Sequence, residues 1–315
     1  MSWTPREIPD QSGRVAVITG ANGGLGLEMT RELARKGAHV VLAARNLDKA
    51  ESAREEIVRE IPGADLEVAG LDLASLESTR NAAAAILAHH SRIDVLANNA
   101  GVMATPEGRT VDDFEVQLGT NHLGHFLLTS LLLPALARTP GARIVSVTST
   151  ARHFGRPIDP DNPHLRGRYT PWRAYGQSKL ANLHFAVELH RRLAAAGADT
   201  ASLVAHPGLS NTDLQATSVA STSGGSSQKF FHALARQTGM SAYRGVQPQL
   251  RAATDPQATS GELYAPRFVN SGPAVRRPLL WRSRARGPAR TLWAVSERET
   301  GITFDVAELV RAAAV

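Results

Sequence analysis

Short apolar runs alternate with segments of helical periodicity along most of the chain. The apolar runs predict strands at 15–18, 39–43, 66–71, 93–97, 143–147, 200–205 and 262–264. The periodic segments predict a first helix ending at 36 and further helices at 47–60, 75–89, 118–137 and 172–196. This alternation is typical of βαβ units. It predicts an α/β fold with a doubly wound parallel sheet, and the continuous apolar character of the strands places helices on both of its faces.

The domain organisation follows from the few breaks in this pattern. The only candidate linker is the Ser/Gly/Thr-rich run 218–228, which we interpret as a loop, and strand-like sequence follows it at 262–264. We therefore expect a single domain over 1–315, with a C-terminal elaboration at about 266–315. Within that elaboration, the stretch 276–290 contains six arginines and is interpreted as surface coil.

The amino-acid composition excludes several classes of protein. Hydrophobic residues make up 43% and charged residues 20% of the 315 positions, an ordinary globular balance. Cysteine is absent, which excludes disulfides, thiolate nucleophiles, Cys-ligated zinc and iron–sulfur clusters. The longest apolar stretch, 127–137, is far short of the roughly 20 residues of a spanning helix. With no apolar signal core at the N-terminus, we expect a soluble, cytoplasmic protein without a membrane span.

The net charge of +6 permits anionic partners, but the basic residues are spread along the chain rather than gathered on one tail. We expect no nucleic-acid partner. The alternative rests on the arginines of 276–290, with Trp281 and Trp293 nearby as residues that stack on bases. A solvated coil or an oligomer contact is the favoured interpretation of this charge run, and a homodimer is left open.

A glycine-rich turn lies between the first strand and the first helix, in the run Thr19-Gly20-Ala21-Asn22-Gly23-Gly24-Leu25-Gly26. Glycines permit a tight turn and the close approach of a pyrophosphate, and the following helix N-terminus offers free N–H groups. Alone, such a turn is weak support for a dinucleotide site. Its position between a strand and a helix strengthens it.

The tip of the second predicted strand bears on the choice of cofactor. An acidic residue there bonds the ribose 2′-hydroxyl of NAD, whereas an arginine accommodates the 2′-phosphate of NADP. This strand runs into Ala44 and Arg45 without an acid, so NADP(H) is favoured over NAD(H). Asp72, after the third strand, suits either the adenine amino group or a cap for the helix that begins near Ser75.

The remaining motifs follow the predicted strands in order. They are Asn98-Asn99-Ala100-Gly101 after the fourth strand, Asn121 in the next helix, Ser149 after the fifth strand, Tyr175-Gly176-Gln177-Ser178-Lys179 in the long helix, and His206-Pro207-Gly208 with Thr212 after the sixth strand. On these elements they resemble the short-chain dehydrogenase/reductase family, over about residues 12–265. The run Tyr175–Asn182, the long gap before it and the strand tip at Arg45 are similar to the retinol dehydrogenase-like and WW-domain oxidoreductase-like branch.

The resemblance implies a Rossmann-type fold and an oxidoreductase acting on an alcohol or carbonyl. The implied catalytic residues are Asn121, Ser149, Tyr175 and Lys179. Those implied to contact the cofactor are Gly20, Asn22, Gly24, Leu25, Gly26, Arg45, Asp72, Leu73, Asn98, Ala100, Gly101, Tyr175, Lys179, Pro207, Gly208 and Thr212. A catalytically retired nucleotide sensor or scaffold is the alternative, and the intact catalytic set argues against it.

The residues themselves suggest how the chemistry works. Tyr175 and Lys179 are i,i+4 on a helix and share a face. A tyrosine normally titrates near pH 10, so an acid/base role near neutrality calls for a pKa lowered by about 3 units. We expect the Lys179 ammonium and the positive nicotinamide ring to supply this. The family role of Ser149 is to orient the substrate oxygen. That of Asn121 is to hold a helix distortion and a water that passes protons to Lys179, which also bonds the ribose.

Two further expectations concern the substrate and metals. Apolar side chains in the 154–173 insertion and in a lid expected at 209–239 favour a lipophilic substrate; they are Phe154, Leu214, Phe230, Phe231, Leu234 and Met240. The histidine pairs His122/His125 and His89/His90 lack an accompanying ligand motif, and no metal site is expected.

Overall fold

The described residues of the computed structural model, 3–209, 240–279 and 285–314, form an eight-stranded sheet in the order β3-β2-β1-β4-β5-β6-β7-β8. Its strands are β1 Val15–Thr19, β2 His39–Ala44, β3 Leu66–Gly70, β4 Val95–Asn98, β5 Arg143–Val147, β6 Ala201–Ala205, β7 Leu263–Pro266 and β8 Ala274–Arg277. All neighbouring strands are parallel except β7 and β8, which run antiparallel. The predicted α/β, doubly wound sheet is confirmed, with an antiparallel edge strand that the sequence pattern did not indicate.

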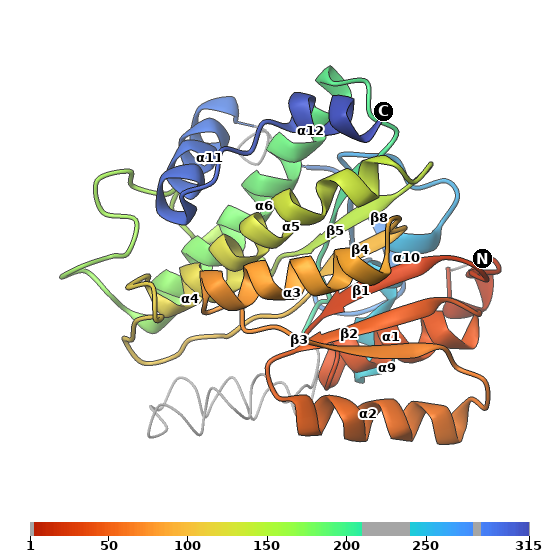
Figure 1. The fold of residues 1–315 in the computed structure, drawn as a ribbon. Coiled ribbons are helices and arrows are strands. Elements are labelled where there is room, and N and C mark those ends of the chain that lie inside the picture. Colours follow the sequence, from red (N-terminus) through yellow and green to blue (C-terminus); the bar gives the residue numbers. More distant parts are fainter. Residues whose placement is uncertain (1–2, 210–239, 280–284, 315) are drawn as a thin grey trace.

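Helices cover both faces of this sheet (Figure 1). The helices and short helical turns are η1 Pro5–Glu7, α1 Gly24–Arg35, α2 Leu47–Glu60, α3 Leu76–His89, α4 Val116–Leu118, η2 Gly119–Leu123, α5 Gly124–Ala137, η3 Thr150–His153, α6 Pro171–Ala195, α9 Ala242–Gly245, α10 Gln247–Thr254, α11 Arg286–Thr300 and α12 Val306–Ala313. The helices α3, α5 and α6 pack on one face, where their apolar residues meet Val17, Val41 and Leu96 of the strands. Ile18, Val40 and Leu42 point to the other face, against α1 and α10.

The 118–137 helix of the sequence prediction is interrupted. A π-helical turn, η2, separates the three-residue α4 from α5, whereas Pro134 lies inside α5. Glu115 is the N-cap of α4, since its carboxylate oxygens accept hydrogen bonds from the N–H groups of Gln117 and Leu118, both at 2.7 Å.

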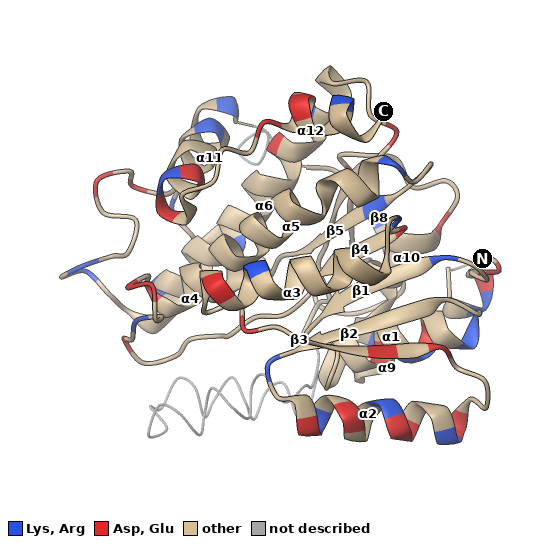
Figure 2. Cartoon of the chain, in the orientation of Figure 1, with Lys and Arg blue, Asp and Glu red and all other residues tan. Residues whose placement is uncertain are grey.

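The prediction of surface coil over 276–290 is wrong at both ends. Arg276 belongs to β8 and pairs with Glu262 at 2.8 Å, and α11 begins at Arg286. The helix forms because Ala289, Leu292 and Trp293 are buried against the core. Trp293 is therefore unavailable to stack on bases, and Trp281 lies outside the described residues. Figure 2 shows basic and acidic residues interspersed along α2.

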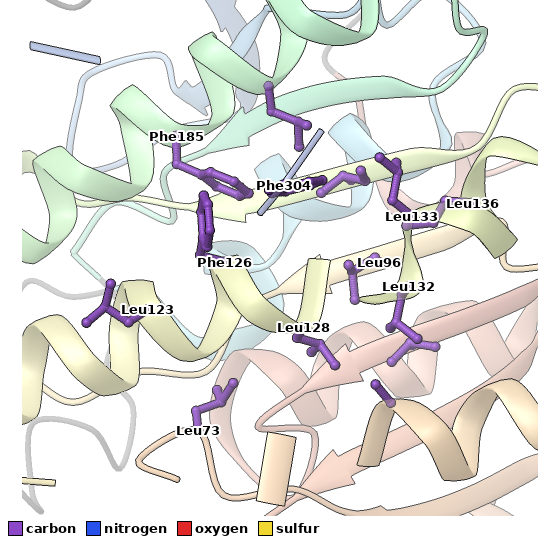
Figure 3. Packing of buried hydrophobic residues seen from close by; sticks show 14 of the residues in the cluster. Leu73, Leu96, Leu123, Phe126, Leu128, Leu132, Leu133, Leu136, Phe185 and Phe304 are labelled. Atoms are coloured by element: carbon purple, nitrogen blue, oxygen red, sulfur yellow. The ribbon is translucent and has the colours of Figure 1, made fainter. Parts of the chain in front are cut away.

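The larger apolar core lies between the sheet and the α3–α5–α6 layer. Leucines of α5 fill it, and at one end the Phe126 ring meets those of Phe185 and Phe304 in T-shaped, edge-to-face contacts (Figure 3). Within the described ranges, no helix combines the length and the apolar character that a membrane crossing requires.

Candidate active site

The predicted site residues gather at one edge of the sheet because parallel strands place their carboxyl ends together. Gly20 follows β1, Arg45 follows β2, and Asn98 ends β4. Ser149 lies two residues beyond β5, and Pro207 lies two residues beyond β6. This is the edge at which open α/β sheets bind their ligands.

Tyr175 lies in the second turn of α6, which Pro171 opens, and its side chain is only 5% exposed. Burial raises the pKa of the Tyr175 hydroxyl to about 12, and a hydrogen bond with the Ser149 hydroxyl opposes that rise. The direction is opposite to the expected lowering, because taking the phenolate out of water outweighs the stabilisation that the protein's own groups provide. The phenol therefore holds its proton throughout the neutral range.

Lys179 lies one turn further along α6, with its side chain buried. Burial lowers the pKa of its ammonium to about 8. The Nζ atom is 5.8 Å from the centre of the Tyr175 ring and donates a long hydrogen bond of 3.4 Å to the Val147 carbonyl. The ammonium is thus held beside the tyrosine on the same helix face, as the i,i+4 spacing predicts.

Asn121 lies in the π turn η2, and its side-chain amide is held on both sides. The N–H of Val102 donates to Oδ1 at 2.7 Å, while Nδ2 donates to the Val102 carbonyl and to the Ser178 hydroxyl, both at 2.9 Å. A Cβ built on Gly101 would lie 2.9 Å from Asn121 Oδ1 and 3.3 Å from Lys179 Nζ. Glycine at position 101 is what allows these two side chains to converge.

Ser149 has two roles in the structure. It precedes η3, and its hydroxyl accepts a hydrogen bond from the Ala151 N–H at 3.2 Å, which is ordinary capping. The same hydroxyl lies near enough to the Tyr175 hydroxyl to lower the pKa of the phenol by hydrogen bonding. The capping hydrogen bond therefore holds the Ser149 hydroxyl in position beside the Tyr175 phenol.

The turn after β1 fits an anionic group. Gly20 has φ +65°, and a Cβ there would lie 3.1 Å from Ala100, so the backbone closes tightly over the start of α1. Gly26 packs beneath it, because a Cβ would come within 2.2 Å of the Gly20 carbonyl oxygen. Helix α1 starts without a side-chain cap or an acidic residue in its first turn, which leaves its N–H groups available for a phosphate. Asn22 lies in this turn, and Gly24 and Leu25 are the first two residues of α1.

Four other predicted cofactor residues have different surroundings. Arg45 is exposed at the strand tip, with no hydrogen bond or ion pair to the part of the chain that the structure describes. Asp72 is half-buried and accepts from the Ala74 N–H at 3.0 Å, and the cap of α3 is Ser75 rather than Asp72. The side chains of Leu73 and Asn98 are buried, and Asn98 Nδ2 donates to Thr129 at 2.9 Å. Arg45 alone among them presents an exposed charge.

The sequence analysis missed three residues that hold the loop after β4. The Thr19 hydroxyl accepts from the N–H groups of Asn99 and Ala100, both at 2.9 Å. Asn99 Nδ2 donates to the Thr19 carbonyl at 2.8 Å, and its Oδ1 accepts from Gln249 at 2.9 Å. Thr19 and Asn99 lie within motifs already identified, although no role was given to them there, whereas no local pattern points to Gln249, 150 residues from Asn99.

The two histidines of the interrupted helix have structural partners. His122 Nε2 lies 2.7 Å from the Ser296 hydroxyl, and His125 bridges the Asn121 carbonyl at 3.0 Å and the Thr19 hydroxyl at 2.8 Å. Burial lowers the pKa of His122 to about 3 and that of His125 to about 4. Both rings are therefore neutral at pH 7.

The structure describes only some of the residues that were predicted to line the substrate pocket. Leu209 and Met240 are joined by a backbone hydrogen bond of 2.8 Å, and Gly208 beside them has φ +75°. Met240 is buried and Phe154 is 58% exposed. The other residues of the predicted lid and pocket, Thr212, Leu214, Phe230, Phe231 and Leu234, lie outside the described residues.

Comparison with known proteins extends this picture. The family model described as short chain dehydrogenase matches residues 14–222. Human retinol dehydrogenase 13 is 44% identical over 203 residues, covering 64% of this chain and 60% of that protein. Mouse polyprenol dehydrogenase is 44% identical over 216 residues, covering 67% and 64% of the two chains. The matched region thus spans less than two thirds of these relatives' length.

A solved structure matches over nearly the whole chain. The crystal structure of an uncharacterized protein from Mycobacterium paratuberculosis is 41% identical, with a TM-score of 0.80. The match covers 96% of this chain and 99% of that one. At this coverage, the likeness extends well beyond residues 14–222, the region that the family model matches.

Proposed function

The chain belongs to the short-chain dehydrogenase family, and from this premise we propose that it transfers a hydride between NADP(H) and a lipophilic alcohol or carbonyl compound. The observation that carries the proposal is the convergence of Ser149, Tyr175, Lys179 and Asn121 at the carboxyl edge of the sheet. A phenol bonded to a fixed serine and flanked by a buried ammonium is suited to proton exchange with a substrate oxygen.

The chain's own residues fit a dinucleotide. The turn at Gly20 and the N-terminus of α1 would hold the pyrophosphate, the Thr19-anchored loop at Ala100 and Gly101 would lie along the cofactor, and Lys179 would bond the nicotinamide ribose. The bound cofactor supplies or accepts the hydride. Arg45 favours NADP(H), because its guanidinium is exposed where a 2′-phosphate would lie and no carboxylate occupies that strand tip.

Tyr175 is the proposed general acid/base. Because burial holds the pKa of its hydroxyl at about 12, the phenol is protonated and ready to donate to a carbonyl oxygen. Ser149 donates a hydrogen bond to the same oxygen and orients it. As the phenol gives up its proton, the Lys179 ammonium stabilises the developing negative charge. In the opposite direction the phenolate form of Tyr175, stabilised by the Lys179 ammonium, takes the proton from the alcohol.

A lipophilic substrate is favoured by two observations. The named relatives are a retinol and a polyprenol dehydrogenase, both named for long apolar alcohols. In this chain, the exposed Phe154 and the buried Met240 place apolar side chains near the ends of β5 and β6. We therefore propose an apolar aldehyde, ketone or primary alcohol rather than a sugar or an acid.

The test begins with a screen of aldehydes, ketones and retinoids with NADPH, followed by Tyr175→Phe on the best substrate. This change keeps the ring and deletes the ionisable oxygen, so we expect NADPH binding to survive and turnover to fall at least about a hundredfold. Tyr243→Phe, at an exposed tyrosine, is the matched control. Near-normal turnover of Tyr175→Phe would refute the mechanism. NADPH binding with no turnover of any substrate would favour the retired sensor or scaffold.

A further inference from the structure

A cluster of histidines and carboxylates lies at the amino edge of the sheet, opposite the candidate active site. His39 begins β2, Glu67 lies in β3, and His89 and His90 end α3. Glu67 pairs in register with Val41, which packs in the core beneath α3, and His39 lies two residues before Val41, so the His39 and Glu67 side chains lie on the face that α3 covers. The adjacent pair His89-His90 gave no signal in the sequence because its partners come from two other elements.

The histidine nitrogens of this cluster lie within ion-pair distance of the Glu67 carboxylate. His90 Nε2 lies 2.8 Å and His39 Nε2 3.5 Å from the same oxygen of Glu67, and the three ligand atoms all lie within 4.8 Å of one another. The rings of His39 and His90 are tilted against each other, with centroids 4.8 Å apart. His89 Nδ1 lies 3.1 Å from the other oxygen of Glu67.

One ring nitrogen aims into the cluster without a hydrogen bond. His39 Nδ1 lies 2.8 Å from the Asp65 carboxylate, so Nδ1 carries a proton and donates it there. The other nitrogen, Nε2, is buried and makes no hydrogen bond to any described residue. In the neutral tautomer its lone pair faces the Glu67 carboxylate at 3.5 Å, an arrangement that a cation between them would satisfy. A carboxylate on the far nitrogen of a histidine is the usual support of a metal ligand.

We propose that His39, Glu67 and His90 form a binding site for a divalent transition-metal ion, with Zn²⁺ as the representative. Two imidazoles and one carboxylate are ligands for zinc and its neighbours rather than for calcium or magnesium. Zinc bonds of about 2.0–2.2 Å require only a small rotation of these side chains. On binding, His90 gives up its Nε2 proton to solvent or moves it to Nδ1.

The cluster is open enough to load and to complete its coordination. Side-chain exposure is 21% for His39, 27% for Glu67 and 13% for His90. Glu67 and His89 line one end of a cavity of about 560 Å³ between β3 and α3, through which a hydrated ion can approach. Water fills the remaining positions. The bound ion joins the edge strand β3 to β2 and to the end of α3, so the site is structural.

The test measures Zn²⁺ binding to the tag-free, full-length chain by equilibrium dialysis and by competition with a chromophoric chelator. We expect one Zn²⁺ per chain, and His39→Gln or His90→Gln to weaken binding by at least about tenfold. Asp65→Asn, which removes only the supporting charge, weakens it by about tenfold to a hundredfold. His190→Gln is the matched control, since that histidine bonds Ser260 on another element and leaves the affinity unchanged.

A second measurement separates lost ligands from a disturbed fold. Saturating Zn²⁺ should raise the Tm of the wild type and of His190→Gln but not of His39→Gln, with all three chains showing the same far-UV circular dichroism without metal. Absence of saturable Zn²⁺ binding to the wild type would overturn the proposal. It would show that a proton on His39 Nε2, rather than a metal ion, lies between this atom and the Glu67 carboxylate. Equal affinity in wild type and both ligand variants would overturn it as well.

Discussion

The Tyr175–Lys179 pair shows how burial sets opposite directions for two side chains one helical turn apart. Desolvation raises the pKa of the phenol to about 12 and lowers that of the ammonium to about 8. Lys179 is therefore the first of the two to lose its proton as the pH rises. In the proposed mechanism, the protonation of Lys179 rather than that of Tyr175 therefore limits activity at alkaline pH.

This order predicts a pH dependence. For carbonyl reduction with NADPH, kcat/KM should be level between about pH 6.5 and 7.5 and fall above about pH 8, as the Lys179 ammonium near Tyr175 is lost. The apparent pKa of this fall in kcat/KM describes Tyr175 and Lys179 together, since the two groups interact. The measurement is kcat/KM across this range with the substrate found by the screen. A profile that stays level to pH 10 would contradict the assignment.

Arg45 carries a second prediction at this scale. Arg45→Ala removes the exposed guanidinium at the tip of β2, a charge-assisted partner worth about 1.5–3 kcal/mol. NADPH affinity should fall by tenfold or more on that basis, with NADH affinity little changed. Fluorescence titration with each cofactor measures this. Arg92→Ala, an exposed arginine at the opposite edge of the sheet, should leave both affinities intact. Equal losses for both cofactors at Arg45→Ala would remove the basis for NADP preference.

At the scale of elements, the interrupted helix places Asn121 in the site. Glu115 starts α4 by accepting from two backbone N–H groups, and Asn121 follows within the π turn. The backbone N–H of Glu115 also donates to His164 Nδ1 at 3.2 Å, which links the start of α4 to the 154–173 insertion. Glu115 thus contacts, through its carboxylate, the segment that carries Asn121 and, through its backbone, the substrate-side insertion.

Burial raises the pKa of Glu115 to about 7, against the hydrogen bonds from Gln117 and Leu118 that lower it. A raised carboxyl pKa means that the folded chain binds this proton more tightly. Its contribution to stability is full below about pH 4.5 and is lost as the pH rises through 7. Glu115→Gln stays neutral, so its free energy of unfolding relative to wild type should increase between pH 4.5 and 7.5, by at most about 3 kcal/mol.

Urea unfolding at several pH values measures that difference. The control is Glu77→Gln, at an exposed glutamate of α3, for which the difference from wild type should not vary with pH. Two parallel curves for wild type and Glu115→Gln would show that the Glu115 carboxyl titrates normally despite its burial.

Comparison of the helices and strands with those predicted shows how much of the fold the sequence alone indicates. The parallel strands and their helices were predicted closely, because buried strands such as β1 and β2 are continuously apolar and glycines such as Gly37 end the helices. Asn121, Ser149, Tyr175 and Lys179 could be selected as candidates because each stands in a local motif, and the catalytic roles given to them remain predictions. The antiparallel strand β8 and helix α11 were missed because their arginines suggested coil, although Ala289 and Trp293 are buried. Contacts such as Gln249 with Asn99, or His39 with His90, depend on tertiary packing that no local pattern encodes.

At the scale of the whole molecule, the C-terminal helices belong to the core rather than lying on its surface. Helix α11 packs on α6 and α12 on α5, the helices that surround the candidate site (Figure 1). Trp293 stacks on Phe304 with centroids 4.8 Å apart and meets Phe126 edge to face at 5.2 Å. His122, which follows Asn121 in the π turn η2, is hydrogen-bonded to Ser296 of α11. The C-terminal segment therefore supports the π turn through direct contacts.

This packing predicts that the aromatic cluster contributes strongly to global stability. Trp293→Ala should lower the free energy of unfolding by about 3–5 kcal/mol, because it removes a 3% exposed side chain and leaves a cavity between α6, α11 and α12. Arg290→Ala, on the exposed side of the same helix, should change it by no more than about 0.5 kcal/mol. Urea denaturation followed by far-UV circular dichroism measures both. If Trp293→Ala were as mild as Arg290→Ala, α11 would be an independent appendage, and the support it gives to the turn at Asn121 would have to come from elsewhere.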